Sequence, residues 1–197
     1  MSQHQDNEDL LPTQTEGYKV GEKKTLEEYQ TLDANDESLN KWKASLGLNA
    51  SGAAAPSDDP RKVVVLALIL KVDGRDDVVM DLSSAAAVEA LSKRTIVIKE
   101  GVVYSLTIRF KIQHDVVSGL KFLQVVKRKG IRVDRSEEML GSYGPNVEPY
   151  EKQFPPDEAP SGMLARGSYA VKGKFVDDDN NVHLEWDWNM DIKKAWE

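Results

Sequence analysis

Trp186 and Trp188 are the residues of this chain whose type and spacing most clearly suggest a binding site. Apolar and polar residues alternate from Val182 to Ile192, which is the pattern of a β-strand with one buried face, and both tryptophans fall on the apolar side. An enclosed indole N–H normally finds a hydrogen-bond partner. The strand therefore either fills a thick core or forms the wall of a pocket for an apolar ligand.

Residues that could catalyse a reaction are sparse. The histidines, His4, His114 and His183, lie in a polar tail, in a turn and on the polar side of a strand pattern, so we expect them to be exposed to solvent. The chain has no cysteine, and it has no phosphate-binding loop, glycine-flanked serine or zinc signature. We expect a protein that binds its partner without catalysing a reaction, and that uses no cofactor and no metal.

Two charged clusters each allow two interpretations. Asp177 to Asp179 could suggest calcium, but an EF-hand loop needs spaced ligands and a distal glutamate, so a solvated hairpin turn is favoured. The basic run Lys127 to Lys129, with Arg132 and Arg135, could attract phospholipid head groups or phosphate. A solvated face of the sandwich is the favoured interpretation of that run.

A β framework must position these residues. Short extended or alternating runs, separated by turn residues, are Lys62–Val72, Val78–Leu82, Thr95–Lys99, Tyr104–Ile112, Leu120–Lys129, Ile131–Val133, Ser168–Val176 and Val182–Ile192. Ser84–Lys93 is the one candidate internal helix. The pattern predicts an all-β protein, an antiparallel β-sandwich.

Two positions bear on whether the sandwich is filled. The proline-rich stretch Gly141–Gly162 cannot be a central strand, and it predicts a functional loop or extra edge structure. Gly173, inside a predicted strand, indicates a bulge or spare volume. Periodicity alone favours a filled core over a pocket.

The N-terminal quarter differs from the rest of the chain. Residues 1–56 carry five Lys/Arg against ten Asp/Glu, so this arm repels nucleic acid and attracts basic partners. Residues 1–24 show no periodicity and are predicted to be disordered. The capping box Thr25–Glu28 and the acidic start at Asp36 predict two short helices, together about 25–47, followed by a flexible linker. Helices this short must pack on the body or order on a partner.

The start of the chain reads MSQHQDNEDLL, without the basic start and apolar core of a secretion signal. No stretch approaches the roughly 20 apolar residues that a membrane-spanning helix needs. We therefore expect a cytoplasmic protein without stable membrane insertion.

Several long motifs resemble the Rho GDP-dissociation inhibitor family. They are Leu32-Asp33, Asp36–Leu39, Lys99–Gly101, Val117–Gly119, Lys127–Gly130, Gly141–Pro145, Glu158–Pro160, Gly162–Tyr169, Asp177–Asp179 and His183–Asn189. The resemblance covers roughly residues 18–197. It implies an immunoglobulin-like sandwich over residues 58–197, preceded by a flexible acidic regulatory arm over residues 1–57.

The resemblance also implies a function. The partners would be geranylgeranylated Rho-family small GTPases, preferably GDP-bound. The arm would fold as a helical hairpin on the GTPase switch regions and slow GDP release. The sandwich would enclose the isoprenoid tail between its sheets and so extract the GTPase from membranes, which reverses the preference of periodicity alone for a filled core.

The family motifs assign roles to individual positions. Those that would contact the GTPase are Leu26, Tyr29, Leu32, Asp36, Leu39 and Trp42 in the arm and Asp179 in the body. Those that would line the prenyl site are Leu70, Ile96, Ile98, Phe110, Val116, Val171, Trp186 and Trp188. The chain departs from the family pattern at Val20-Gly21, at Trp42, and at Glu138, where an aromatic residue is common near the pocket.

Overall fold

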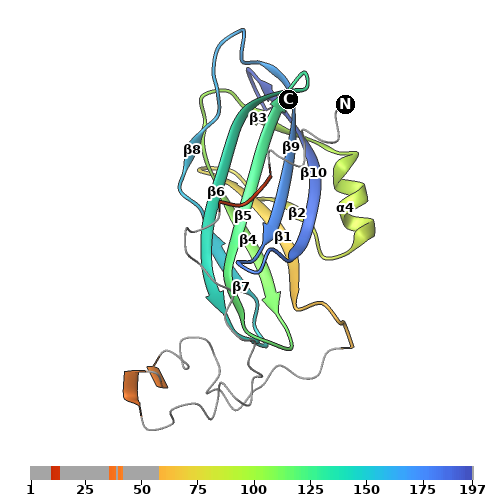
Figure 1. Cartoon of the computed structure of the whole chain (residues 1–197). Helices are drawn as coiled ribbons and strands as arrows, with labels where there is room; N and C mark the ends of the chain where they lie inside the picture. Colours follow the sequence, from red (N-terminus) through yellow and green to blue (C-terminus); the bar gives the residue numbers. More distant parts are fainter. Residues whose placement is uncertain (1–9, 14–35, 39, 42–57, 197) are drawn as a thin grey trace.

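Two β-sheets packed face to face make up the body of the protein (Figure 1). The structure, a computed structural model, describes residues 10–13, 36–38, 40–41 and 58–196. Its strands are β1 (Val63–Val72), β2 (Val78–Asp81), β3 (Thr95–Lys99), β4 (Val103–Ile112), β5 (Val117–Arg128), β6 (Ile131–Tyr143), β7 (Tyr150–Gln153), β8 (Asp157–Glu158), β9 (Gly167–Val176) and β10 (Val182–Lys193). The all-β sandwich predicted from the sequence is confirmed.

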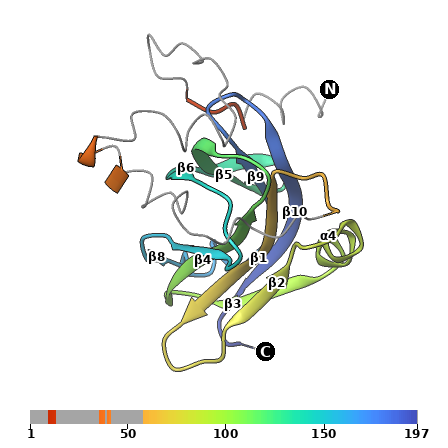
Figure 2. The same cartoon turned by 90° about the horizontal axis from the view of Figure 1, so that it is seen from below.

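The first sheet has the order β2-β1-β4-β7, and β8 also pairs with β4; the second has the order β3-β10-β9-β5-β6. Neighbouring strands are antiparallel except for β3 and β10, which are parallel. The helix α4 (Ala85–Ser92) connects β2, at the edge of the first sheet, to β3, at the edge of the second, and lies along the side of the sandwich (Figure 2). The sequence predicts this helix. The Ser84 hydroxyl accepts a hydrogen bond from the Ala87 N–H and so caps its first turn.

Strand β6 is much longer than the predicted Ile131–Val133. It continues to Tyr143 and pairs with β5 along its whole length. Its sequence is polar because β6 is an edge strand, so apolar alternation does not mark it. The proline-rich stretch supplies the short edge strands β7 and β8, which agrees with the expectation of extra edge structure.

The core lies between the sheets and follows the alternation of each strand. Along β5, Phe122 and Val126 belong to this core, whereas Leu123 and Val125 point to the opposite face. The interior around the tryptophans is filled, because Trp186 and Trp188 are each only 2% exposed. Within the described ranges, no helix has the length and apolar content needed to cross a membrane.

Gly173 does not mark spare volume. It lies directly across the β9–β10 pair from Trp186, and a Cβ atom at this position would come within 2.6 Å of the indole ring. The space left by the missing side chain is therefore occupied by the Trp186 ring. The expectation of an empty volume at this position was wrong, because the cross-strand neighbour uses it.

A short N-terminal segment, residues 10–13, lies on the outer face of the second sheet. Leu10 is 2% exposed and forms a small apolar cluster with Leu123, Val125 and Val176. Its carbonyl accepts a hydrogen bond from Lys174 at 3.3 Å. The predicted disorder of residues 1–24 is wrong for residues 10–13, because two adjacent leucines within a polar stretch carry no periodicity that the sequence could show.

Polar contacts hold the rest of residues 10–13, which we call the anchor segment. The Leu11 carbonyl accepts from Arg135 at 2.8 Å, and the Thr13 carbonyl accepts from Lys121 at 3.1 Å. The Thr13 N–H and hydroxyl both donate to the Glu137 carboxylate, at 3.0 and 2.8 Å. The anchor segment therefore binds the sheet through both its backbone and its side chains.

Candidate functional site

A cleft of about 210 Å³ opens where the edges of the two sheets come together. We call it the edge cleft. It is lined by Tyr104 and Leu106 from β4, Phe122 and Gln124 from β5, Asp134, Ser136 and Glu138 from β6, and Phe154, Pro155, Pro156 and Asp157 from the β7–β8 connection. The proline pair ends β7 and turns the chain over the cleft, since proline cannot donate to a sheet.

A row of aromatic rings leads from the edge cleft into the core. Phe154 stacks on Phe122 with their ring centroids 5.1 Å apart, and Phe122 stacks on Trp186 at 5.7 Å with an interplanar angle of 10°. Phe154 and Phe122 line the cleft, so Trp186 lies one ring behind its wall. Any change in the cleft wall that moves Phe122 therefore reaches Trp186 directly.

Several buried polar atoms around this row have no hydrogen-bond partner in the described part of the protein. They include the indole Nε1 atoms of Trp186 and Trp188 and the side-chain oxygen of Gln124, a residue that lines the edge cleft. An unpaired buried polar group typically costs about 1–3 kcal/mol. The buried polar groups beside the cleft are therefore less completely hydrogen-bonded than those of an ordinary core.

The mouth of the edge cleft is acidic. Asp134, Glu138 and Asp157 all line it, and the Tyr104 hydroxyl donates to Asp157 at 3.2 Å. Burial, followed by the negative charge of Asp157, raises the pKa of Tyr104 above its usual range. The phenol therefore stays neutral, and the carboxylates give the mouth a negative potential that attracts cations.

The predicted prenyl-site residues lie mainly in the core between the sheets. Leu70, Ile96, Ile98, Phe110, Val171, Trp186 and Trp188 all belong to one buried cluster. Val116 is half-buried in the connection between β4 and β5 and is not part of that cluster. None of these residues lines the edge cleft itself, whose wall stands in front of them.

Sequence reasoning missed the residues that form the cleft wall. Tyr104, Leu106 and Phe122 fall within predicted strands, where they are typical of ordinary core, and Phe154 lies in the proline-rich stretch predicted as a functional loop or edge structure. Glu138, where the chain departs from the family pattern, lines the cleft. The sequence did not show that β6 pairs with β5, and this pairing brings the polar edge strand to the opening of the cleft.

Most predicted GTPase contacts in the arm lie outside the described residues: Leu26, Tyr29, Leu32, Leu39 and Trp42. Asp36 is described, and it begins a helical turn: its carboxylate accepts from the Ser38 N–H at 2.8 Å and its carbonyl accepts from the Asn40 N–H at 2.9 Å. The predicted acidic helix start at this position is therefore present.

Asp179 is exposed in the turn between β9 and β10, where an approaching protein can reach it. Its neighbour Asp177 is buried and accepts hydrogen bonds from the Asn181 N–H at 2.9 Å and the His183 ring at 2.9 Å. Burial opposes ionisation, but these hydrogen bonds outweigh it and hold the pKa of Asp177 below its usual value. The expectation of an exposed His183 was wrong, because its side chain is only 10% exposed, whereas Asp179 and Asn180 in the turn are exposed.

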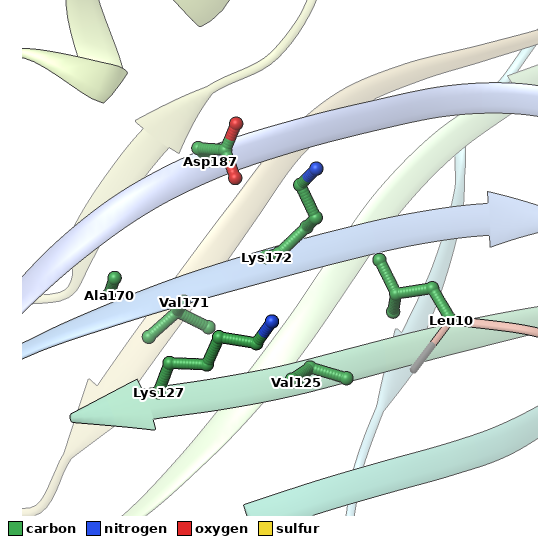
Figure 3. Close-up of a pocket in the computed structure, with 7 residues that line it drawn as sticks. All are labelled: Leu10, Val125, Lys127, Ala170, Val171, Lys172 and Asp187. Carbon is green, nitrogen blue, oxygen red and sulfur yellow. The ribbon is translucent and has the colours of Figure 1, made fainter. Parts of the chain in front are cut away.

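A second hollow, of about 140 Å³, lies on the outer face of the second sheet beside the anchor segment. Figure 3 shows Leu10 and Val125 at one side of it, with Lys127 and Lys172 projecting from β5 and β9 and Asp187 from β10. Lys172 is also paired with Glu185 at 3.0 Å. The two ammonium groups make this hollow a poor site for a long hydrocarbon, so the edge cleft is the better candidate.

Comparison with known proteins identifies relatives over nearly the whole chain. Residues 2–195 match the family described as RHO protein GDP dissociation inhibitor. The chain is 52% identical over 177 residues to the Rho GDP-dissociation inhibitor of Schizosaccharomyces pombe, covering 90% of this chain and 86% of that protein. It is 44% identical to Rho GDP-dissociation inhibitor 1 of Homo sapiens, covering 91% of this chain and 86% of that protein. It is also 44% identical to the Rho GDP-dissociation inhibitor of Saccharomyces cerevisiae, covering 90% of each.

Proposed function

Because this chain belongs to the Rho GDP-dissociation inhibitor family, we propose that it binds Rho-family GTPases and inhibits their release of GDP. It acts by binding, and it prefers the GDP-bound, geranylgeranylated form of its partner. The arm, residues 1–57, inhibits GDP release, and the sandwich, residues 58–197, binds the lipid tail. The protein acts from the cytoplasm.

The sandwich takes up the isoprenoid tail through the edge cleft. The observation that carries this assignment is an apolar opening between the sheets, with an aromatic row leading inward and carboxylates around its mouth. The tail of a Rho-type GTPase is apolar, and a basic segment beside it would be drawn to the acidic mouth. Burial of a lipid chain contributes about 0.8 kcal/mol per CH₂, so extraction from a bilayer needs a comparably apolar enclosure.

The cleft must widen to hold such a tail. At about 210 Å³ it is smaller than the roughly 300–1,000 Å³ of typical ligand pockets. Movement of Phe122 and Phe154 would open a path toward Trp186, Trp188 and the other prenyl-site residues proposed from the sequence: Leu70, Ile96, Ile98, Phe110, Val116 and Val171. In this proposal these core residues line the site only when the tail is bound.

Titration with a geranylgeranylated peptide tests the tail site. In a Trp42→Phe/Trp196→Phe background the remaining tryptophans are Trp186 and Trp188, so their emission reports on the interior. The emission should change in a saturable way, whereas the same peptide without its lipid should give no change. A flat response to the lipidated peptide would sink the tail site and favour a sandwich with a solid core that binds protein only, an alternative supported by the tight packing of both tryptophans.

The arm contacts the switch regions of the GTPase through Leu26, Tyr29, Leu32, Asp36, Leu39 and Trp42, and Asp179 of the body faces the same partner. Asp36→Ala should weaken inhibition of GDP release several-fold and leave tail uptake unchanged. The reason is that Asp36 lies in the arm, whereas tail uptake belongs to the sandwich. The matched control is Glu37→Ala, which removes the next exposed carboxylate. Equal loss of both activities in Asp36→Ala would contradict separate roles for arm and sandwich.

A further inference from the structure

Met163 and Leu164 are the most exposed large apolar residues on the described surface, at 83% and 89%. They lie side by side in the loop between β8 and β9, within the motif Gly162–Tyr169. Neither the edge cleft nor the contacts proposed for the GTPase use them. Adjacent large apolar side chains left in water usually mark an interaction site.

The backbone of this loop is held firmly. The Ala165 and Arg166 N–H groups donate to the Gly162 carbonyl at 3.0 and 3.2 Å, and the Gly162 N–H donates to Glu100 at 3.0 Å. Arg128 donates to the carbonyls of Leu164 and Arg166. The loop is therefore displayed in a fixed conformation, with its polar backbone paired and its apolar side chains outward.

Arg128 joins this loop to the turn between β5 and β6. Arg128 pairs across that turn with Ile131, which is itself 71% exposed, and Lys129 and Gly130 form the turn with positive φ angles of 49° and 80°. The same turn carries the cations that the sequence singled out. We call Met163, Leu164 and Ile131, with Arg128, Lys129 and Arg132, the tip surface.

The tip surface lies at one end of the sandwich, next to the part of the sheet edge along which the edge cleft opens. Asp134 and Asp157 both line the cleft. Asp134 lies two residues after Arg132 on β6, and Asp157 lies in β8, which precedes the exposed loop. Asp157 pairs with Tyr104 at the start of β4, and β9 begins at this same end. The β8–β9 loop and the β5–β6 turn lie together at the top of Figure 1, and the edge cleft opens along the half of β6 nearest to them.

We propose that the tip surface docks on a lipid bilayer that carries anionic head groups. Exposed apolar side chains beside basic ones are the combination that binds such a surface, because the apolar groups enter the interface while the cations pair with lipid phosphates. Met163 and Leu164 would enter the head-group region, and Arg128, Lys129 and Arg132 would lie at its level. The proposal rests on the proposed function in one respect: docking places the cleft mouth where a lipid tail leaves the bilayer.

Site-specific fluorescence on the full-length protein tests this docking. The chain has no cysteine, so Leu164→Cys gives a single position for an environment-sensitive dye. With vesicles of phosphatidylcholine and phosphatidylserine, dye at position 164 should brighten and shift to the blue, and the response should fall with salt. Dye at Val182→Cys should not respond, because Val182, 50% exposed, begins β10 at the opposite end of the sandwich. Vesicles of phosphatidylcholine alone should bind about tenfold more weakly.

Apolar contact is tested by Met163→Gln/Leu164→Gln, which should lower binding to the mixed vesicles by about tenfold. Met139→Gln is the matched control, since Met139 is 52% exposed on β6, and it should bind like the parent protein. No response at position 164, or equal responses at positions 164 and 182, would overturn the proposal. Both glutamine variants should bind a soluble geranylgeranylated peptide as tightly as the parent protein does. If the parent protein did not bind this peptide, the proposed tail site would be wrong, whereas the docking proposal would still be tested by the vesicle measurements.

Discussion

Gly173 shows how a single missing side chain determines the interior of this protein. The Trp186 ring occupies the position where any other residue would place its Cβ atom. The same ring stacks on Phe122, so its position also fixes the back of the cleft wall. A residue without an evident binding role therefore controls the shape of the site.

Gly173→Ala should reduce the free energy of unfolding by about 1–3 kcal/mol, because the added methyl group must displace the indole. Chemical denaturation measures this change, and near-UV circular dichroism should show an altered tryptophan environment. Ala170→Ser, at an exposed position of the same strand, should stay within about 0.5 kcal/mol of the parent. An alanine variant as stable as the parent would show that the ring can move freely.

Asp177→Asn should destabilise the protein by about 1–3 kcal/mol near neutral pH, because the buried carboxylate accepts hydrogen bonds from Asn181 and His183. The folded-state pKa of Asp177 lies below its unfolded value, so its stabilising contribution is complete above about pH 4 and is lost as the pH falls through the folded pKa. Parent and variant should therefore converge in acid. Unfolding curves recorded from pH 7 to pH 3 measure this, with the exposed Asp179→Asn as a control of little effect.

At the scale of elements, the anchor segment is the feature that joins the N-terminal region to the sandwich. Leu10 contributes buried apolar surface, and the lysine, arginine and glutamate contacts orient the backbone around it. Neighbouring Leu11 is 59% exposed although its carbonyl is held by Arg135. The two leucines therefore offer a matched pair in which only one side chain is buried.

Leu10→Asp should release the anchor segment, since a carboxylate would replace the apolar contacts that Leu10 makes with Leu123, Val125 and Val176. Methyl NMR signals of those residues should shift, and the unfolding free energy should fall by about 1–3 kcal/mol. Leu11→Asp should leave the signals in place. Identical spectra for Leu10→Asp and the parent would show that the cluster does not depend on Leu10.

Strands with regular alternation could be predicted from the sequence, and the cleft could not. The runs ending at Ile112 and Ile192 have one polar and one apolar face, so local pattern determined them. The polar edge strand β6 and the cleft wall depend on which strands become neighbours, and no local pattern encodes that. The anchor segment escaped notice for the same reason, because its apolar partners lie more than a hundred residues along the chain.

At the scale of the whole molecule, charge is divided between the acidic cleft mouth and the basic tip surface beside it. Asp134 and Asp157 are exposed carboxylates, so their attraction for a basic peptide weakens with salt. In the two proposals above, the acidic cleft mouth would attract the basic segment of a membrane-bound partner, and the basic tip surface would contact the lipid around it.

Asp134→Asn/Asp157→Asn should weaken binding of a geranylgeranylated peptide with a basic segment by about two- to fivefold at low salt, since exposed charge pairs each contribute about 0.2–1 kcal/mol. The same lipidated peptide with its lysines replaced by glutamine should bind both proteins equally. Titrations at two salt concentrations measure this, and a loss that is the same for both peptides would show that the carboxylates support the cleft rather than attract charge.

The anchor segment also gives the chain a second point of attachment to the sandwich. Thr13 is held there by its contacts with Glu137 and Lys121, and residue 58 leads into the same sandwich. Bringing two points of a chain together has an entropic cost that grows as about (3/2)RT ln n, and the contacts of the anchor segment offset it. Loss of Leu10 would weaken the first attachment, and a partner that binds both points at once would then have to offset that cost itself.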